Sequence, residues 1–381
     1  MGEGAGRGGG PDSSRARPLV DVQEMGHTAA PGPTAVDSVE RLLERAHALG
    51  ASDLHLDPTE EGLAATVRRD GILEPLETLP IELHLRVVGR LKALADLLAY
   101  RTDVPQEGRI PADRTGLGTE IRVATYPTVS GERVALRLEA AAGVPKTFQD
   151  LGLSDSVRAS LERAFDQPEG VILLTGPSGS GKTTTLYAAL AHLLANGRRR
   201  AIVTVEDPVE RRVAGVSQTQ IDPAAGLTFS RALRSLLRQD PDVLLVGEIR
   251  DRETAAVALE AGLTGHLVAS TIHAGRASLV FARLLDLGVE PFAITTAVRG
   301  VLAQRLVRRR LPDGRLEGRV LVAEWLPMSA PLRRAILARG DGETLANAAL
   351  EAGAVSIDEA AADLIRRGVT TEEEVRRVLG D

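Results

Sequence analysis

The chain has 381 residues, 43% of them hydrophobic and 26% charged, with a formal net charge of −6 and no cysteine. This length allows two to three domains at about 150 residues each, and the lack of cysteine excludes disulfides, thiolate zinc sites, iron–sulfur clusters and a cysteine nucleophile. The negative charge and an aromatic content of 2% argue against a general nucleic-acid-binding protein.

The first 34 residues have the composition of a disordered arm. They contain 8 glycines and 4 prolines, too little apolar material to bury a core. This stretch lacks the apolar segment of a secretory signal, and no apolar run in the chain approaches the roughly 18 residues needed to span a bilayer. We therefore expect a cytoplasmic protein whose ordered part begins near Val36.

Residues 35–140 show the mixed pattern of a compact α+β domain. Asp37 can cap a first helix that Gly50 ends, and a second helical pattern occupies residues 80–99. Alternating residues, with turns at Asp70-Gly71 and Ser130-Gly131, predict strands at 53–56, 63–68, 120–125 and 133–138. Residues 141–150 have the composition of a linker.

Between residues 151 and 330, short apolar strands alternate with helical stretches. We predict strands at 171–174, 201–205, 243–246 and 267–270, and helices at 183–195, 229–238 and 252–261. This alternation indicates βαβ units and a parallel sheet, so the predicted fold class is α/β. The basic run Arg305 to Arg310 is interpreted as a solvated helix end, and residues 331–381 as a helical C-terminal subdomain.

One motif points to nucleotide chemistry. The segment GPSGSGKT fits G-x-x-x-x-G-K-[ST] and stands between an apolar strand and a helix-forming run, the setting that a phosphate-binding loop requires. Lys182 would meet the β- and γ-phosphates, and the Thr183 hydroxyl would bind Mg²⁺. We therefore expect ATP and Mg²⁺ to bind at Gly176, Pro177, Ser178, Gly179, Ser180, Gly181, Lys182, Thr183 and Thr184.

Two acids end neighbouring predicted strands and can complete such a site. Glu206 follows the strand at 201–205; Glu248 follows the strand at 243–246, behind a glycine where most phosphate-loop ATPases carry an aspartate. We assign Glu248 to the water shell of Mg²⁺ and Glu206 to polarising the attacking water, although the two roles could be exchanged. Alternatively, Glu206 is a surface ion-pair partner.

Two histidines, His266 and His273, flank the apolar strand at 267–270. His273 stands where a γ-phosphate sensor would lie, whereas each of the two could also be a histidine satisfied at a strand end. No further histidine or cysteine is available there to complete a ligand set, so metal binding by these two residues is not expected.

Arginines gather on one face of the predicted helix at 229–238. At 100° per residue, Arg231, Arg234 and Arg238 lie opposite the apolar side, with no acid on their own face. A solvated face is one interpretation; nucleotide phosphates, including those of a neighbouring subunit, would also balance this charge. The N-terminal domain carries a matching feature on adjoining strands, formed by Arg122, Arg133 and Arg137.

Together these motifs resemble those of the type II secretion and type IV pilus assembly ATPases. The resemblance runs from Ala51 to Asp381 and rests on ASDLHLDP, RVATYPTVSGERVALRL, GPSGSGKTTTLYAAL, VTVEDPVE, RQDPDVLLVGEIRDRETA, TGHLVASTIHA and QRL. It implies an N-terminal PAS-like domain, a RecA-like ATPase core, and a homo-hexamer pressed against a platform protein at the inner face of the bacterial inner membrane. It also implies that Arg122 and Arg137 reach the nucleotide, and that Arg234, Arg238, Arg250 and Arg319 line the site or the subunit border.

The chain departs from this family pattern in two places. The paired CxxC motifs that hold zinc after QRL are absent, so no zinc is expected, and residues 1–34 are too few for the further membrane-docking domain of assembly members. Both departures favour a retraction-type motor, whereas GERVALRL and the C-terminal tail favour an export-type one. The direction of the motor therefore stays open.

Two alternatives from other classes stay open as well. The first is a conjugation or DNA-uptake translocase, which the net charge and low aromatic content disfavour, so no nucleic-acid partner is expected. The second is a nucleotide-binding regulator without turnover, which the complete set of Lys182, Thr183, Glu206 and Glu248 disfavours.

Overall fold

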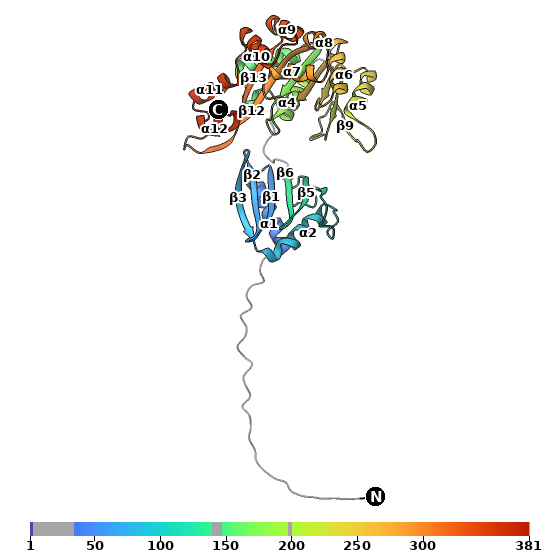
Figure 1. Cartoon of the computed structure of the whole chain (residues 1–381), viewed down its shortest axis with the longest axis vertical. Helices are drawn as coiled ribbons and strands as arrows, with labels where there is room; N and C mark the ends of the chain where they lie inside the picture. Colours follow the sequence, from blue (N-terminus) through green and yellow to red (C-terminus); the bar gives the residue numbers. More distant parts are fainter. Residues whose placement is uncertain (3–33, 139–146, 197–199, 381) are drawn as a thin grey trace.

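The computed structural model describes residues 1–2, 34–138, 147–196 and 200–380, which form two sheet-containing parts (Figure 1). Most of the arm predicted at 1–34, and most of the linker predicted at 141–150, lies outside these residues. Within the described ranges, no helix combines the length and apolar character needed to cross a membrane.

The N-terminal part is a six-stranded antiparallel sheet with the strand order β3-β2-β1-β6-β5-β4. Leu54, Leu56 and Leu136 are buried in one core cluster with residues of two helices, and the alternate residues of these strands face away from it. The elements are α1 (Ala35–Ala48), β1 (Asp53–Thr59), β2 (Gly62–Arg69), β3 (Ile72–Leu79), α2 (His84–Leu94), β4 (Gln106–Ile110), β5 (Ile121–Thr128) and β6 (Gly131–Leu138).

This part corrects two expectations from the sequence. The cap of α1 is Thr34 and not Asp37: the Thr34 hydroxyl accepts a hydrogen bond from the Asp37 N–H, and the Asp37 carboxylate accepts one from the Thr34 N–H. Asp37 is thus the third helical residue of a capping box. Strands β3 and β4 are additional to the four predicted strands. They contain Pro75 and Gly108, which are poor strand formers and weaken the strand pattern in the sequence.

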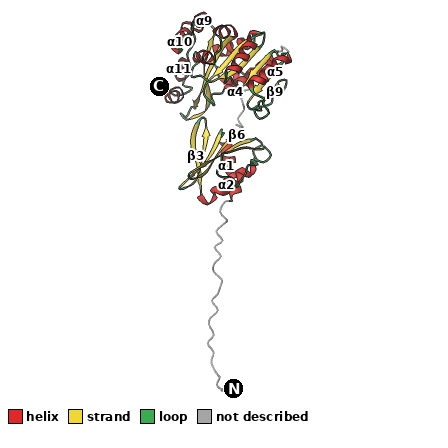
Figure 2. Cartoon of the chain, turned by 45° about the vertical axis from the view of Figure 1, so that its right-hand side comes forward, coloured by secondary structure: helices red, strands yellow, loops and turns green. Residues whose placement is uncertain are grey.

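The core part is a seven-stranded sheet with the order β13-β12-β7-β11-β10-β8-β9, in which all strands except β13 run parallel. Helices lie on both sides of it (Figure 2). Val171 and Leu173 of β7 belong to the cluster that includes α6 and α8, and Ile172 and Leu174 to the cluster that includes α3 and α4. The predicted α/β class is confirmed.

The four predicted strands and three predicted helices of this α/β region occur in the predicted order with small shifts at their ends, and α3, β9, α7 and α8 are additional to them. In chain order the elements are α3 (Asp155–Phe165), β7 (Gly170–Thr175), α4 (Lys182–Ala195), β8 (Ile202–Glu206), β9 (Ser217–Gln220), α5 (Phe229–Leu236), β10 (Val243–Val246), α6 (Arg252–Leu263), β11 (Leu267–Ile272), α7 (Leu279–Asp286) and α8 (Pro291–Ala297).

A long hairpin of β12 (Val298–Arg310) and β13 (Leu316–Pro327) extends the core sheet. The interpretation of Arg305 to Arg310 as a helix end was therefore wrong. The strand tolerates this charge because Arg308 pairs at 2.9 Å with the fully buried Glu374 of the last helix, while Val307 on the other side is buried. The helices after the hairpin are α9 (Ala330–Leu337), α10 (Gly342–Glu351), α11 (Ile357–Arg366) and α12 (Glu372–Leu379).

The two parts of the chain touch at the turn between β2 and β3, an end of the N-terminal sheet that faces the core in both views (Figures 1 and 2). Asp70 and Gly71 have positive φ values of 49° and 84°, the conformation that Asp-Gly hairpin turns require. The Asp70 carboxylate accepts a hydrogen bond from the Gly318 N–H at 2.8 Å and lies 3.6 Å from the Arg319 Nε.

Candidate active site

A cavity of about 550 Å³ opens at the carboxyl ends of the parallel strands. Its walls are the loop between β7 and α4, the ends of β8, β10 and β11, and side chains of both parts of the chain, among them Arg137 of β6 and Arg319 of β13. Open α/β sheets bind their ligands at this edge. The cavity brings together most of the residues that the sequence singled out.

The loop after β7 has the backbone conformation that its glycines permit. Gly179 and Gly181 have φ values of +74° and +90°, which other residues rarely adopt, and α4 starts directly afterwards at Lys182. A helix N-terminus offers unpaired N–H groups and the positive end of the helix dipole, both of which favour phosphate. Of the predicted loop, Ser178, Gly179, Gly181, Lys182, Thr183 and Thr184 line the cavity, and Gly176, Pro177 and Ser180 do not.

The ammonium group of Lys182 is held at the mouth of this loop. It donates hydrogen bonds to the carbonyl oxygens of Gly176 at 2.8 Å and Pro177 at 2.9 Å. Burial lowers the pKa of Lys182, and the nearby Glu248 carboxylate acts in the opposite direction. Gly176 itself is packed tightly, since a Cβ atom there would lie 2.4 Å from the Gln304 carbonyl oxygen.

Glu206 ends β8 inside the cavity and is only 5% exposed, so it is not the surface ion-pair partner that the sequence left open. One carboxylate oxygen accepts hydrogen bonds from the Thr204 hydroxyl at 2.5 Å and the Gln218 amide at 3.1 Å; the other accepts from the Tyr187 hydroxyl at 2.6 Å. Burial and the bond to Glu206 raise the pKa of Tyr187 well above its usual range, so it remains a donor. Three neutral donors thus fix the carboxylate.

Sequence reasoning did not find these three donors. Thr204 stands two residues before Glu206 on the same strand, so strand periodicity alone places both side chains on one face. Tyr187 lies four residues after Thr183 on α4, which is one helical turn along the face that starts in the cavity. Gln218 belongs to β9, a short strand that the sequence analysis did not predict.

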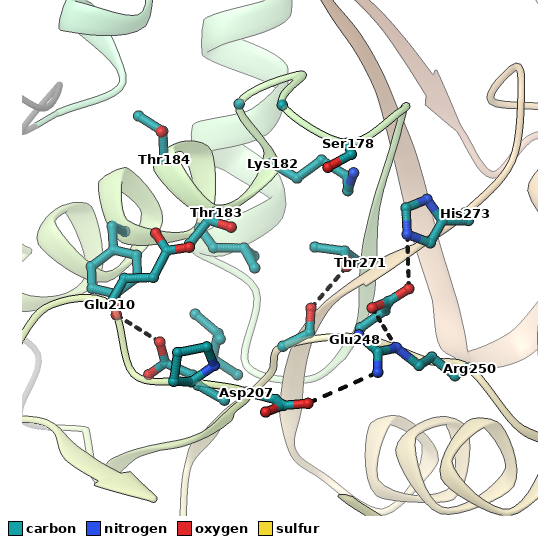
Figure 3. A pocket seen from close by; sticks show the side chains of 18 of the residues that line it. Ser178, Lys182, Thr183, Thr184, Asp207, Glu210, Glu248, Arg250, Thr271 and His273 are labelled. Atoms are coloured by element: carbon teal, nitrogen blue, oxygen red, sulfur yellow. Dashed lines mark hydrogen bonds and ion pairs between the residues drawn. The ribbon is translucent and has the colours of Figure 1, made fainter. Parts of the chain in front are cut away.

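Glu248 follows β10 and contacts two side chains, His273 and Arg250 (Figure 3). One of its oxygens lies 2.9 Å from the His273 Nε2 and the other accepts a hydrogen bond from the Arg250 Nε at 2.7 Å. Arg250 also lies 3.9 Å from the Asp207 carboxylate, so these four side chains, all of which line the cavity, form a continuous series of polar contacts. The structure therefore brings together Glu248, His273 and Arg250, three residues that the sequence analysis placed at the nucleotide site.

Gly247 occupies the position where most phosphate-loop ATPases have an aspartate. A Cβ atom there would lie 3.2 Å from the Val205 carbonyl oxygen and 3.4 Å from the Glu206 Cα. Close approach of β8 and β10 thus favours glycine at this point, and the acid that follows it, Glu248, lines the cavity together with Glu206.

His266 is a satisfied strand-end residue, since its Nδ1 lies 3.1 Å from the Ala261 carbonyl oxygen and it is not part of the cavity wall.

One arginine on the arginine-rich face of α5 has an acidic partner from outside the helix, which the sequence did not predict. Arg234 pairs with Glu253 of α6 at 2.5 Å, and Arg231 donates to the Gly226 carbonyl oxygen. The partners come from outside the helix, so helix periodicity could not show them. Neither Arg234 nor Arg238 lines the cavity within one chain.

The N-terminal sheet contributes one arginine to the cavity. Arg137 lines it, whereas Arg122 lies beside Arg137 on β5 and does not. Arg133 pairs with Asp57 at 2.8 Å, away from the cavity. Among the remaining predicted residues, Arg250 and Arg319 both line the cavity.

A phosphate loop, two shielded carboxylates and cationic side chains from two parts of the chain define a nucleotide-binding protein with a RecA-like core. Comparison with known proteins gives the family. The family model described as "Type II/IV secretion system protein" matches residues 31–377, and the chain belongs to this family.

Two curated relatives and one solved structure show the extent of the similarity. The chain is 38% identical to type II secretion system protein E of Xanthomonas campestris pv. campestris, covering 95% of this chain and 70% of that protein. It is 40% identical to type II secretion system protein HxcR of Pseudomonas aeruginosa, covering 95% of this chain and 80% of that protein. The X-ray structure of the Legionella pneumophila ATPase DotB aligns with a TM-score of 0.69 at 25% identity, over 90% of this chain and 95% of that one.

Proposed function

We propose that the chain is a Mg²⁺-dependent ATP hydrolase that works as a homo-hexameric motor in type II secretion or in type IV pilus assembly or retraction. It would act from the cytoplasmic side on an inner-membrane platform protein. The observation that carries this proposal is the cavity that joins the phosphate loop, Glu206, Glu248 and arginines from both parts of the chain. Membership of the secretion family supports the transport role.

In the proposed reaction the chain supplies position and charge. Lys182 exchanges the loop carbonyl oxygens for the β- and γ-phosphates, and Arg137 and Arg319 bind the phosphates from the sides. Glu206 orients the attacking water and accepts its proton; the donors to it that the described residues supply, Tyr187, Thr204 and Gln218, are all neutral. Glu248, which is already paired with Arg250 and His273, suits the metal shell better than the base role.

The residues present fit a magnesium ion. Thr183 supplies a hydroxyl and Glu248 a carboxylate to the same cavity, and such hard oxygen donors are what Mg²⁺ prefers. Across the described ranges no group of three or more His, Cys, Asp or Glu residues that could hold a metal ion is found. When bound, the ion offsets phosphate charge.

The proposed hexamer gives the remaining arginines a role. Arg122, Arg234 and Arg238 lie outside the cavity of a single chain, so they would act at the border with a neighbouring subunit. Light scattering of the purified protein with a non-hydrolysable ATP analogue tests the assembly. A hexamer is expected, and a monomer at all concentrations would contradict it.

Phosphate release by two variants tests the enzyme assignment. Lys182→Ala should lose both ATP binding and turnover, whereas Glu206→Gln should retain binding and lose roughly 10²–10⁴ in turnover, the usual contribution of a general base. Near-normal hydrolysis by either variant would remove that residue from the mechanism. Wild-type ATP binding without turnover would instead indicate a regulator, and turnover stimulated by DNA in a salt-dependent manner would indicate a translocase.

A further inference from the structure

Two of the three arginines that line the cavity, Arg137 and Arg319, each have an aspartate of the N-terminal part as partner. The Arg137 Nε lies 3.4 Å from an Asp53 carboxylate oxygen, and the Arg319 Nε lies 3.6 Å from an Asp70 carboxylate oxygen. Neither aspartate itself lines the cavity. The guanidinium groups of Arg137 and Arg319, which we propose bind phosphate, therefore already contact carboxylates of the chain itself.

We propose that Asp53 and Asp70 compete with the nucleotide for these guanidinium groups and recapture them when the γ-phosphate has left. The inference rests on the proposed function and adds two residues that set how tightly the triphosphate is held. A phosphate carries more charge than a carboxylate and can bind a guanidinium with two parallel hydrogen bonds, whereas the contacts to Asp53 and Asp70 are long, so ATP displaces the aspartates. After hydrolysis and phosphate release, the aspartates pair with the arginines again, and the affinity for the product ADP falls.

The two pairs are weak enough to exchange. Both N–O distances are longer than in a close ion pair, and the side chains of Arg137 and Arg319 are 67% and 41% exposed. Ion pairs of this kind contribute little, because water competes with them and long side chains lose freedom. Nucleotide binding can therefore break each pair at small cost.

The aspartates are held in place without their arginines. Asp53 accepts a hydrogen bond from the Ser52 hydroxyl at 2.8 Å, and Asp70 accepts one from the Gly318 N–H at 2.8 Å. Asp70 also sits in a turn with positive φ, which fixes its direction. When a guanidinium group moves to the phosphate, the aspartate that it leaves stays in place and can pair with it again.

The same sheet offers a matched control. Asp57 lies on the same strand as Asp53 and pairs with Arg133 at 2.8 Å, but neither residue lines the cavity. Asp57→Asn removes a comparable carboxylate from the same sheet without touching the arginines of the cavity. Asparagine keeps the shape and one acceptor oxygen in every case, and it tolerates the positive φ of position 70.

The test measures binding of a fluorescent ATP analogue and steady-state hydrolysis by Asp53→Asn, Asp70→Asn and Asp57→Asn. Each of the first two should bind the ATP analogue about two- to fivefold more tightly, the factor that loss of one exposed competing ion pair allows, with kcat and KM falling together. Asp57→Asn should match the wild type. Circular dichroism confirms that all variants are folded.

Unchanged or weaker ATP binding by both Asp53→Asn and Asp70→Asn would overturn the inference, because the aspartates would then merely support the fold or orient the arginines. A wild-type protein that binds no ATP would refute the proposed function itself. The two failures are therefore distinguishable by the wild-type measurement.

Discussion

Replacing Tyr187 with phenylalanine tests how the proposed base is held. The Tyr187 hydroxyl is the donor to one oxygen of Glu206, at 2.6 Å, while Thr204 and Gln218 both serve the other oxygen. A hydrogen bond to a charged group contributes about 1.5–3 kcal/mol. At 1.36 kcal/mol for each tenfold change in rate, its loss corresponds to a fall in kcat of about 10- to 150-fold, an upper range because the other two donors remain.

Phosphate release and binding of a fluorescent ATP analogue are the assays. Tyr187→Phe should lower kcat and leave ATP affinity within about twofold of the wild type, because Lys182 and the phosphate loop are untouched. Tyr126→Phe, which removes the hydroxyl of a 60% exposed tyrosine on the N-terminal sheet, is the control and should have no effect. A folded Tyr187→Phe protein with wild-type kcat would refute the reasoning that this hydroxyl positions Glu206 for catalysis.

Three further predictions follow from other contacts. Arg137→Ala should lower hydrolysis at least tenfold while thermal unfolding of the core is unchanged; full activity with intact hexamers would contradict the role of this arginine. Burial raises the pKa of Glu374, but hydrogen bonds from Arg377 and Arg308 outweigh this and bring it to about 2. Glu374→Gln should therefore lower the free energy of unfolding by about 2–3 kcal/mol at pH 7, and this difference should shrink as the pH falls from about 4.5 towards 2. The exposed Glu372, replaced by Gln, is its control in urea titrations and should change little. Arg234→Ala should change the stability of the single chain by less than about 1 kcal/mol, since its pair with Glu253 is half exposed, but should weaken hexamer formation measured by light scattering.

Local patterns in the sequence predicted much of the core. The phosphate loop, the strand before it and α4 after it follow from glycine spacing and apolar runs over a few residues. The same holds for the positions of Glu206 and Glu248, because the carboxyl ends of parallel strands meet at one edge of a sheet. Features that depend on residues close in sequence could therefore be predicted from local patterns.

Contacts between distant residues could not be predicted. The Arg305 to Arg310 run is a strand because it pairs with β13, and the charge of its Arg308 is balanced by Glu374, more than sixty residues later. Arg234 is balanced by Glu253 of the next helix, and Asp70 reaches Arg319 across the two parts of the chain. Each of these pairs depends on tertiary packing, which helix or strand periodicity does not contain.

The crystal structure of the protein with a non-hydrolysable ATP analogue and Mg²⁺ tests the central claim most directly. The claim predicts the triphosphate in the cavity after β7, with the Lys182 ammonium and the Arg137 or Arg319 guanidinium within hydrogen-bond distance of its oxygens, and with Asp53 or Asp70 released from its arginine. A cavity without nucleotide, or a bound nucleotide with no guanidinium from the N-terminal sheet or the β12–β13 hairpin nearby, would contradict it.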